Sequence, residues 1–325
     1  MTTVATHPRQ HRASRLVLLA VLVTVVSAAF APVGAARTDA STSAAVRIWT
    51  IHYTAHNGLV RTAYVILPAW YGPEHNPPLP LVISPHGRAA NGLQNADYWD
   101  AMPAVGRFAV ICPDGMGRTL ALYSYGDPGQ VDDLARMPGF ATKALPWLRI
   151  DRSRIYALGS SMGGQETLLL VARHPELLAG AAAMDSVTDL ALRYRQIPGE
   201  ELRDMMSREV GGTPQTAPGA YAARSAFLQA SRIASSRVPL QIWWSTKDRI
   251  VINQQSQSGA LYTAIRQLDP CASVSDYVGS WAHSTEMRAH ALLPIALSGF
   301  GLLPRAYMQL PDDVRHDTAP QCSAA

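Results

Sequence analysis

Ser161 stands in the motif Gly159-Ser160-Ser161-Met162-Gly163, between an apolar segment and a helix-forming one. A serine on a tight turn from a strand to a helix has its hydroxyl raised out of the sheet, and small residues two positions before and after it leave room for that turn. The spacing therefore predicts a nucleophile elbow, with Ser161 as the nucleophile of an acyl transfer. The alternative is a turn of small residues that only packs a helix on a sheet.

A serine hydroxyl is a weak nucleophile, so it needs a base to take its proton and an acid to orient that base. Asp248 and His283 each follow an apolar, strand-like segment later in the chain. Loops at the carboxyl ends of parallel strands meet at one edge of a sheet, and elbow serines are followed in sequence by the acid and then the histidine. We expect His283 to be the base and Asp248 the acid, with Asp185 as the rival acid.

The oxyanion of a tetrahedral intermediate needs N–H donors aimed at it. The backbone N–H of Met162 is one candidate, because it would lie at the N-terminus of the helix after Ser161. The second donor is expected from the loop His86-Gly87-Arg88, where Gly87 permits a close backbone approach and an N–H near Arg88 can face the oxyanion. We expect His86 to hold this loop in place rather than to act as a second base.

Aromatic residues near these segments are candidates for the substrate pocket. Tyr123, Tyr125 and Trp281 are predicted to line it, as is the segment 97–99, although packing in the core would explain the same residues equally well. The sequence has no His-Glu-x-x-His or paired-cysteine motif for a metal and no glycine-rich motif for a dinucleotide or a nucleoside triphosphate. We therefore expect an enzyme that uses neither a metal nor a cofactor.

Strand-like and helix-like segments alternate along the chain, which predicts an α/β fold with a mostly parallel, doubly wound sheet. Asn57-Gly58 between two apolar segments predicts an antiparallel hairpin at the N-terminal edge. Residues 130–148 are helical by pattern, with Pro138 as a boundary inside them. The expected strands are 48–53, 59–67, 81–84, 108–112, 155–158, 179–184, 240–245 and, last, 274–278; the expected later helices are 165–173, 254–268 and, last, 285–297.

Residues 190–238 interrupt this alternation with several glycines and prolines. An insertion between two strands commonly covers a pocket and influences substrate choice. We therefore expect a cap-like insertion within a catalytic domain at 46–303, and the sequence leaves open whether the cap moves as a lid. Residues 304–325 are expected to form a C-terminal tail.

Residues 1–36 have the pattern of a secretory signal: three arginines, an apolar segment of about 15 residues, then small residues. An uncleaved anchor is the alternative, but the apolar segment is short for a spanning helix, which needs ~20 residues. Residues 37–45 form a polar, flexible lead-in. Without those three arginines the net charge falls from +4 to about +1, so nothing favours a nucleic-acid partner. We expect a secreted protein with no membrane contact after cleavage.

The chain has three cysteines, Cys112, Cys271 and Cys322. Cys112 ends an apolar segment and is expected to be a buried thiol. Export permits disulfides, and Cys271 and Cys322 both lie late in loop-like sequence. A bridge between these two would tie down the tail, but the sequence does not decide the pairing.

The chemistry-bearing residues occur in an order that resembles the α/β-hydrolase superfamily over about residues 45–300. That order is His86-Gly87, then Gly159 to Gly164, then Asp248, then His283. Within the superfamily, residues 211–214 and 220–225 resemble the catalytic domain of prolyl oligopeptidase-type proteins and related secreted esterases. The resemblance implies an α/β-hydrolase fold and a serine hydrolase.

Two departures from the oligopeptidase pattern affect the expected substrate. Such peptidases usually carry a large propeller before the hydrolase domain, for which we expect no room here, and the loop at Arg88 lacks their second glycine. By resemblance to feruloyl, acetyl-xylan and polyhydroxyalkanoate esterases, we expect a secreted enzyme that cleaves small-molecule or polysaccharide-linked esters through an acyl-enzyme. The alternatives are a serine peptidase acting on short peptides and a non-catalytic binding protein on the same scaffold.

Overall fold

The computed structural model describes residues 45–285 and 292–318. The predicted signal at 1–36, the lead-in up to residue 44, Cys322 and the first turns of the predicted last helix lie outside the described residues. In the part of the chain that is described, no helix is both long and apolar enough to cross a membrane.

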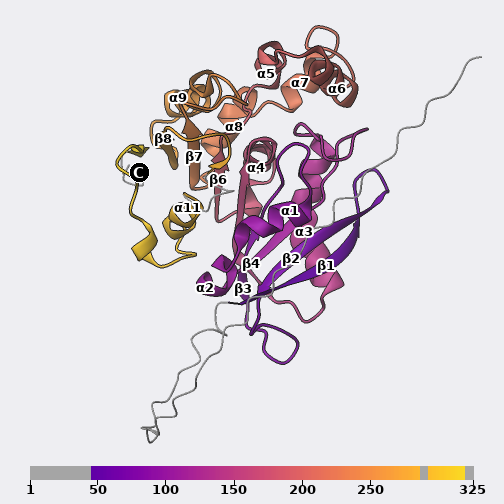
Figure 1. Cartoon of the computed structure of the whole chain (residues 1–325), viewed down its shortest axis with the longest axis vertical. Helices are drawn as coiled ribbons and strands as arrows, with labels where there is room; N and C mark the ends of the chain where they lie inside the picture. Colours follow the sequence, from indigo (N-terminus) through magenta and orange to yellow (C-terminus); the bar gives the residue numbers. More distant parts are fainter. Residues whose placement is uncertain (1–44, 286–291, 319–325) are drawn as a thin grey trace, which may run out of the picture. The chain divides into compact units, whose positions relative to one another are not determined.

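Nine strands form one sheet in the order β1-β2-β4-β3-β5-β6-β7-β8-β9 (Figure 1). Their bounds are β1 (Val46–Thr54), β2 (Val60–Pro68), β3 (Leu79–Ile83), β4 (Ala109–Pro113), β5 (Ile150–Ser160), β6 (Gly180–Met184), β7 (Leu240–Ser245), β8 (Val274–Gly279) and β9 (Arg315–Thr318). The pairings from β4 to β8 are parallel, whereas β1–β2, β2–β4 and β8–β9 are antiparallel. The predicted α/β fold, with an antiparallel hairpin at its N-terminal edge, is confirmed.

The hairpin turn forms where Asn57-Gly58 predicts it. β1 and β2 pair from Thr54 opposite Val60, and Gly58 has a φ of +81°, a left-handed conformation that glycine adopts without steric cost. The backbone N–H of Gly58 donates to the carbonyl of Ala55 over 2.9 Å, which closes the turn.

Helices cover both faces of the sheet. The described helices are α1 (Gly92–Ala96), α2 (Met102–Gly106), α3 (Pro128–Ala144), α4 (Met162–Arg173), α5 (Leu190–Gln196), α6 (Glu200–Val210), α7 (Pro218–Ala223), α8 (Ala230–Ser235), α9 (Ser258–Leu268) and α11 (Leu293–Gly299). Buried residues of α3, α4, α8 and α9 share one core with the sheet, and those of α1 and α11 share the other. The sheet is therefore doubly wound.

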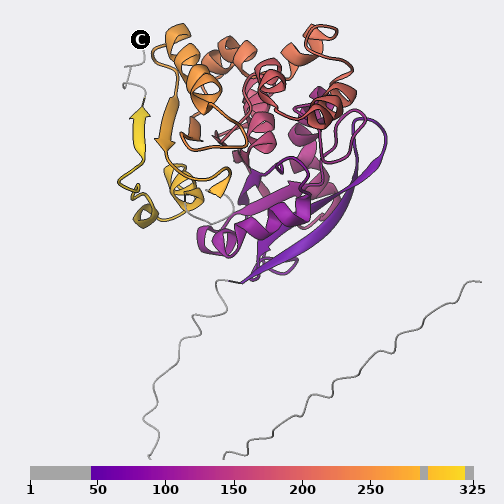
Figure 2. The same ribbon diagram turned by 45° about the horizontal axis from the view of Figure 1, so that its top comes forward.

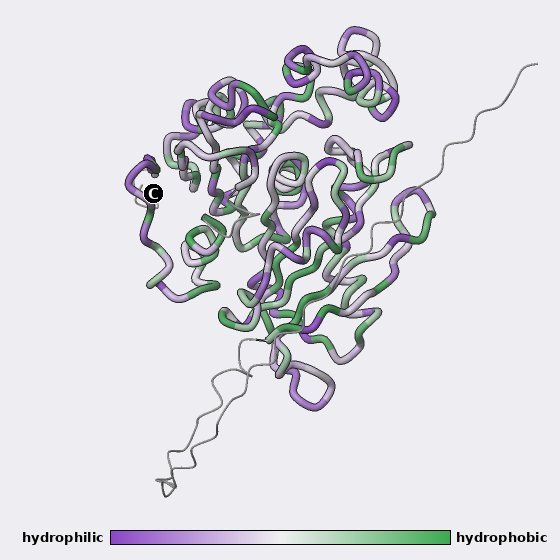
Figure 3. Tube along the Cα trace, in the orientation of Figure 1, coloured by the Kyte–Doolittle hydropathy of each residue, from purple (hydrophilic) through white to green (hydrophobic). Residues whose placement is uncertain are grey.

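The central strands are apolar along their whole length, as strands covered on both faces must be. Every residue of β3, β4, β6 and β7 is buried. In Figure 3 the hydrophobic stretches gather in this central part of the sheet. This rigid layer holds the loops at the carboxyl ends of its strands.

The insertion at 190–238 divides into two parts. Its last helix, α8, packs into the main core, whereas α5, α6 and α7 gather with one another in both views (Figure 1 and Figure 2). These three helices bury a separate apolar cluster that includes Leu190, Met206 and Tyr221, together with Tyr125 and Val251 from outside the insertion. The cluster joins the insertion to the loops after β4 and β7.

Two of the expected boundaries were wrong. Pro138 lies inside α3 rather than at a boundary; it costs the helix one hydrogen bond, but its ring is buried in the core and the helix continues. The segment 274–278 is not the last strand, because β9, in the predicted tail, pairs with β8.

The cysteines behave differently from one another. Cys112 is a free thiol and fully buried, and burial raises its pKa to about 12. Cys271 is disulfide-bonded, while its predicted partner Cys322 lies outside the described residues.

Candidate active site

Ser161 occupies the turn between β5 and α4, with φ 59° and ψ −120°. Such a backbone conformation costs about 1–3 kcal/mol for a residue with a side chain, and it persists only where the surroundings enforce it. Two glycines make room for it: a Cβ on Gly159 would lie 2.5 Å from the carbonyl oxygen of Gly163, and one on Gly163 would lie 2.2 Å from that of Pro85. This is the geometry that the sequence motif predicts.

His283 and Asp248 come together beside this turn. Nδ1 of His283 lies 2.7 Å from Oδ2 of Asp248. The carboxylate is itself fixed by the backbone N–H groups of Ile250 at 2.8 Å and Val251 at 2.9 Å and by Nε2 of Gln254 at 3.1 Å. Burial opposes its charge, but the hydrogen bonds from His283, Gln254 and Ile250 outweigh burial and lower the pKa of Asp248. The imidazole therefore has an ionised partner at neutral pH.

The rival acid, Asp185, makes different contacts. It is fully buried after β6; its Oδ1 accepts the N–H of Ser245, and its Oδ2 accepts the N–H of Ser284 and the indole N–H of Trp281, each over 2.9 Å. Within the described residues it makes no hydrogen bond to His283. Burial raises the pKa of Asp185 to about 6. The structure therefore favours Asp248 over Asp185 as the group that orients the imidazole.

Asp185, Asp248 and His283 also form a group whose possible ligand atoms lie within 4.8 Å of one another. The near atoms of Asp248 and His283 face each other, and both oxygens of Asp185 accept backbone or indole N–H groups. These hydrogen bonds account for the cluster without a metal ion.

Two backbone segments face Ser161 as the oxyanion prediction requires. Met162 is the first residue of α4, so its N–H has no acceptor within the helix. A Cβ on Gly87 would lie 4.0 Å from the Cβ of Ser161, which places the loop carrying Arg88 against the serine. His86 is buried, and its ring nitrogens lie 2.7 Å from the carbonyl oxygen of Gly87 and 2.9 Å from that of Asp114. Its contacts are those of a residue that holds the loop.

Ser161 lies between two pockets, which share Arg88, Ser161 and Ile250. The first, here called the His283 pocket, has a volume of about 220 Å³ and is also lined by Gly87, Ala90, Asn95, Tyr98, Ser160, His283 and Ser284. The second, here called the Arg193 pocket, is a narrow space of about 30 Å³ that is also lined by Tyr125, Met162, Gln165, Val187, Arg193, Ile197, Leu202, Met206 and Val251. A substrate bonded to Ser161 can extend into both.

Comparison with known proteins supports the fold and the chemistry. Residues 114–271 match the model of the prolyl oligopeptidase family. The "Uncharacterized peptidase YtmA" of Bacillus subtilis (strain 168) is 31% identical over 107 residues, which are 33% of this chain and 40% of that protein. Poly(3-hydroxyalkanoate) depolymerase C of Paucimonas lemoignei is 25% identical over 227 residues, 65% of this chain and 51% of that protein. The chain thus spans about half, or less, of these curated relatives.

One solved structure is matched over almost its whole length. The S-formylglutathione hydrolase FrmB from Staphylococcus aureus matches with a TM-score of 0.59 at 15% identity, over 79% of this chain and 99% of that one. The chain therefore shares the α/β-hydrolase fold. The match to the prolyl oligopeptidase family includes Ser161 and Asp248, and the two relatives are named as a peptidase and as a depolymerase.

The three aromatic residues predicted for substrate contact lie in different places. Tyr125 is buried and lines the Arg193 pocket. Tyr123 lies behind it, with the two ring centres 6.4 Å apart, and lines neither pocket. Trp281 donates its N–H to Asp185 and lines a shallow depression on another side of His283. In the segment 97–99, Tyr98 lines the His283 pocket, whereas Trp99 is fully buried.

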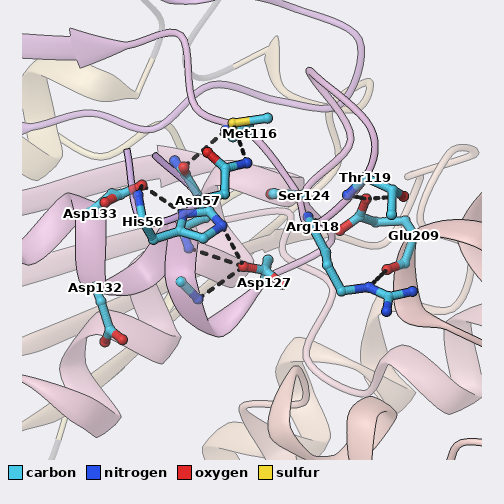
Figure 4. A network of polar contacts seen from close by, with 12 residues as sticks. His56, Asn57, Met116, Arg118, Thr119, Ser124, Asp127, Asp132, Asp133 and Glu209 are labelled. Atoms are coloured by element: carbon cyan, nitrogen blue, oxygen red, sulfur yellow. Dashed lines mark hydrogen bonds and ion pairs between the residues drawn. The ribbon is translucent and has the colours of Figure 1, made fainter. Parts of the chain in front are cut away.

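Glu209 fastens the insertion at 190–238 to the loop after β4 (Figure 4). Its buried carboxylate accepts the backbone N–H groups of Arg118, Thr119 and Leu120, the last two over 2.8 Å, and the hydroxyl of Thr119 over 3.0 Å. Charge-assisted bonds of this kind are among the stronger hydrogen bonds in proteins. They connect α6 to the segment that leads to Tyr125.

A buried ion-pair network continues from this fastening. Arg224, after α7, lies 2.8 Å from Oδ2 of Asp127 and 3.5 Å from Oε1 of Glu209. His56 in turn lies 3.4 Å from Asp127 and 2.7 Å from Asp133, and Figure 4 shows these contacts side by side. Removing one partner of such a buried pair leaves an uncompensated charge, so the network resists displacement of the insertion.

Sequence reasoning missed the pocket residues that the insertion supplies. Arg193, Ile197, Leu202 and Met206 reach the Arg193 pocket from α5, α6 and the turn between them. The alternation of polar and apolar residues in 190–206 indicates helices with one buried face. It does not indicate which face of these helices lies next to Ser161.

Proposed function

We propose that this protein is a serine hydrolase and a secreted esterase, and that it works through a Ser161–His283–Asp248 triad. The hydrogen bond of Asp248 to Nδ1 of His283, in a pocket that the imidazole shares with Ser161, carries the proposal. In this geometry the other ring nitrogen, Nε2, is left to take the proton of Oγ.

The proposed reaction has two halves. Oγ of Ser161 attacks the ester carbonyl while His283 takes its proton, and the N–H groups of Met162 and Arg88 hold the oxyanion. His283 then gives the proton to the departing alcohol, and an acyl-serine remains. Water, deprotonated by His283, attacks this acyl group, and the carboxylic acid leaves as Ser161 is protonated again.

The charges beside the serine support an ester over a short peptide. An enzyme that holds the ammonium end of a short peptide needs a carboxylate near its serine, because a buried ammonium must be paired. Among the described residues, the two pockets at Ser161 are lined by Arg88 and Arg193 and by no acidic side chain. The polyhydroxyalkanoate depolymerase relative, itself named for ester cleavage, is in line with this choice.

A peptidase is the second candidate function. The match to the prolyl oligopeptidase family and the relative named as a peptidase favour it, and its chemical steps at Ser161 would be the same.

Hydrolysis of p-nitrophenyl esters from acetate to palmitate, beside a panel of aminoacyl p-nitroanilides, separates the two. Ser161→Ala is the blank. Serine-dependent ester turnover with silent anilides supports the esterase, and anilide rates equal to the ester rates would replace it with the peptidase. Mass spectrometry of the protein from a culture medium tests secretion, for which we expect the mature chain to begin after residue 36.

A further inference from the structure

Two arginines line the space next to Ser161, and among the described residues neither has an anionic partner. Arg193 lies on α5, is only 9% exposed and lines the pocket that bears its name. Arg88 lines both pockets. Within 45–285 and 292–318, neither guanidinium makes a hydrogen bond or an ion pair. Arg224 provides the contrast, because it is also buried but is paired with Asp127.

The burial of Arg193 beside a second arginine costs free energy. A buried charge needs a counter-charge, since desolvation otherwise outweighs what packing gains. Burial and the neighbouring charge of Arg88 both lower the pKa of Arg193. The charge of Asp248 acts on the pKa of Arg193 in the opposite direction, but this carboxylate is bonded to His283. An anion that enters the pocket would relieve this repulsion.

The location of the pair indicates which part of a substrate would carry the anion. The inference here rests on the proposed esterase mechanism, in which His283 protonates the leaving alcohol. That alcohol must therefore lie in the pocket lined by His283, and the acyl part must lie in the other one, which His283 does not line. The remaining lining of the Arg193 pocket is mostly apolar, with Val187, Ile197 and Met206.

We propose that Arg193 and Arg88 bind a carboxylate at the far end of the acyl group, so that the preferred substrates are half-esters of dicarboxylic acids. Two guanidinium groups can each donate hydrogen bonds to one carboxylate, which fixes its position as well as its charge. The carboxylate takes no part in the bond changes: Ser161 displaces the alcohol from the acyl carbon, and water then displaces Ser161.

Matched ester pairs test the proposal. Mono-p-nitrophenyl adipate and p-nitrophenyl hexanoate differ only in the terminal carboxylate, as do the suberate and the octanoate. We expect kcat/KM to favour the carboxylate esters by about tenfold to a hundredfold, the range of a charge-assisted hydrogen bond. Arg193→Gln should bring this ratio close to one, and Arg193→Lys should restore part of it.

Arg195→Gln is the control, because it removes the same charge from the same helix at an exposed position. We expect it to keep the wild-type ratio. Two results would overturn the carboxylate site: equal kcat/KM values for the two esters of a pair in the wild type, or an unchanged ratio in a folded Arg193→Gln. Serine-dependent turnover of the hexanoate would still support the esterase function in either case.

A binding measurement removes the dependence on turnover. Calorimetry with Ser161→Ala should show tighter binding of monomethyl adipate than of methyl hexanoate, and the additional change Arg193→Gln should abolish the difference. If the wild type cleaves no ester and this difference is still seen, the esterase proposal fails and the carboxylate site stands. If no difference is seen, the carboxylate site fails.

Discussion

The indole N–H of Trp281 donates to Oδ2 of Asp185 over 2.9 Å and joins the loop of His283 to the end of β6. The same oxygen accepts the N–H of Ser284, and Oδ1 accepts the N–H of Ser245, also over 2.9 Å. One buried carboxylate therefore holds residues on both sides of His283 without bonding to the imidazole. Asp185 is a positioning residue in the proposed mechanism.

Asp185→Asn should loosen this loop. The amide keeps one acceptor oxygen, but its NH2 group would face an N–H donor that then stays unsatisfied. We expect kcat/KM for a p-nitrophenyl ester to fall by about tenfold and the free energy of unfolding to fall by about 1–3 kcal/mol. Ester kinetics and urea unfolding measure the two. Asp151→Asn is the control, because this carboxylate bonds to nearby Ser153, and it should change neither kcat/KM nor the free energy of unfolding. A wild-type kcat/KM in Asp185→Asn would contradict the positioning role of Asp185.

Two helical glycines should respond in opposite directions to the same change. A Cβ on Gly163 meets the carbonyl oxygen of Pro85 at 2.2 Å, so Gly163→Ala must displace the loop at 85–88 or the start of α4. We expect a loss of at least about tenfold in kcat/KM together with lower stability. A Cβ on Gly139 of α3 has nothing within 4 Å, so Gly139→Ala should raise the free energy of unfolding by about 0.5–1 kcal/mol with unchanged kinetics. Equal effects of the two would refute this reading of the elbow.

The fastening at Glu209 predicts that the insertion is a fixed cover rather than a freely moving lid. Glu209→Gln removes the charge that three backbone N–H groups and Arg224 face, and we expect it to cost about 3 kcal/mol of stability or more. Cleavage by a protease within 211–217 should become faster. Glu201→Gln, at an exposed position on the same helix, is the control and should be cleaved at the wild-type rate. If Glu209→Gln is also cleaved at the wild-type rate, the apolar cluster alone holds the insertion in place.

The parts of the site that sequence could predict are those that local sterics determine. The turn at Ser161 needs small residues at 159 and 163 whatever lies around it, and Asp248 and His283 each follow a strand whose end is marked by its apolar pattern. Parallel strands then bring their following loops to one edge.

The parts that sequence could not predict depend on how distant segments pack. Arg193 and Arg195 are alike in the sequence, but the packing of α5 buries the first beside the serine and exposes the second. Trp281 was expected in the substrate pocket, and its N–H is instead bonded to Asp185, 96 positions away. Pro138 marks a helix end only where its ring is not buried in the core.

Glu166 should make the stability of this protein depend on pH. It is buried on α4, and desolvation, with the charge of Asp127, raises the pKa of its carboxyl to about 8. Because the folded pKa lies above the unfolded one, this stability is fully present below about pH 4.5 and is lost as the pH rises towards 8. Glu166→Gln removes the titration, so its free energy of unfolding relative to wild type should rise by more than ~1 kcal/mol from pH 5 to pH 8. Urea unfolding across this range measures it. Glu74→Gln, at an exposed position, is the control, and its free energy of unfolding relative to wild type should not change between pH 5 and pH 8. If this difference is also constant for Glu166→Gln, the carboxyl of Glu166 is ionised throughout that range.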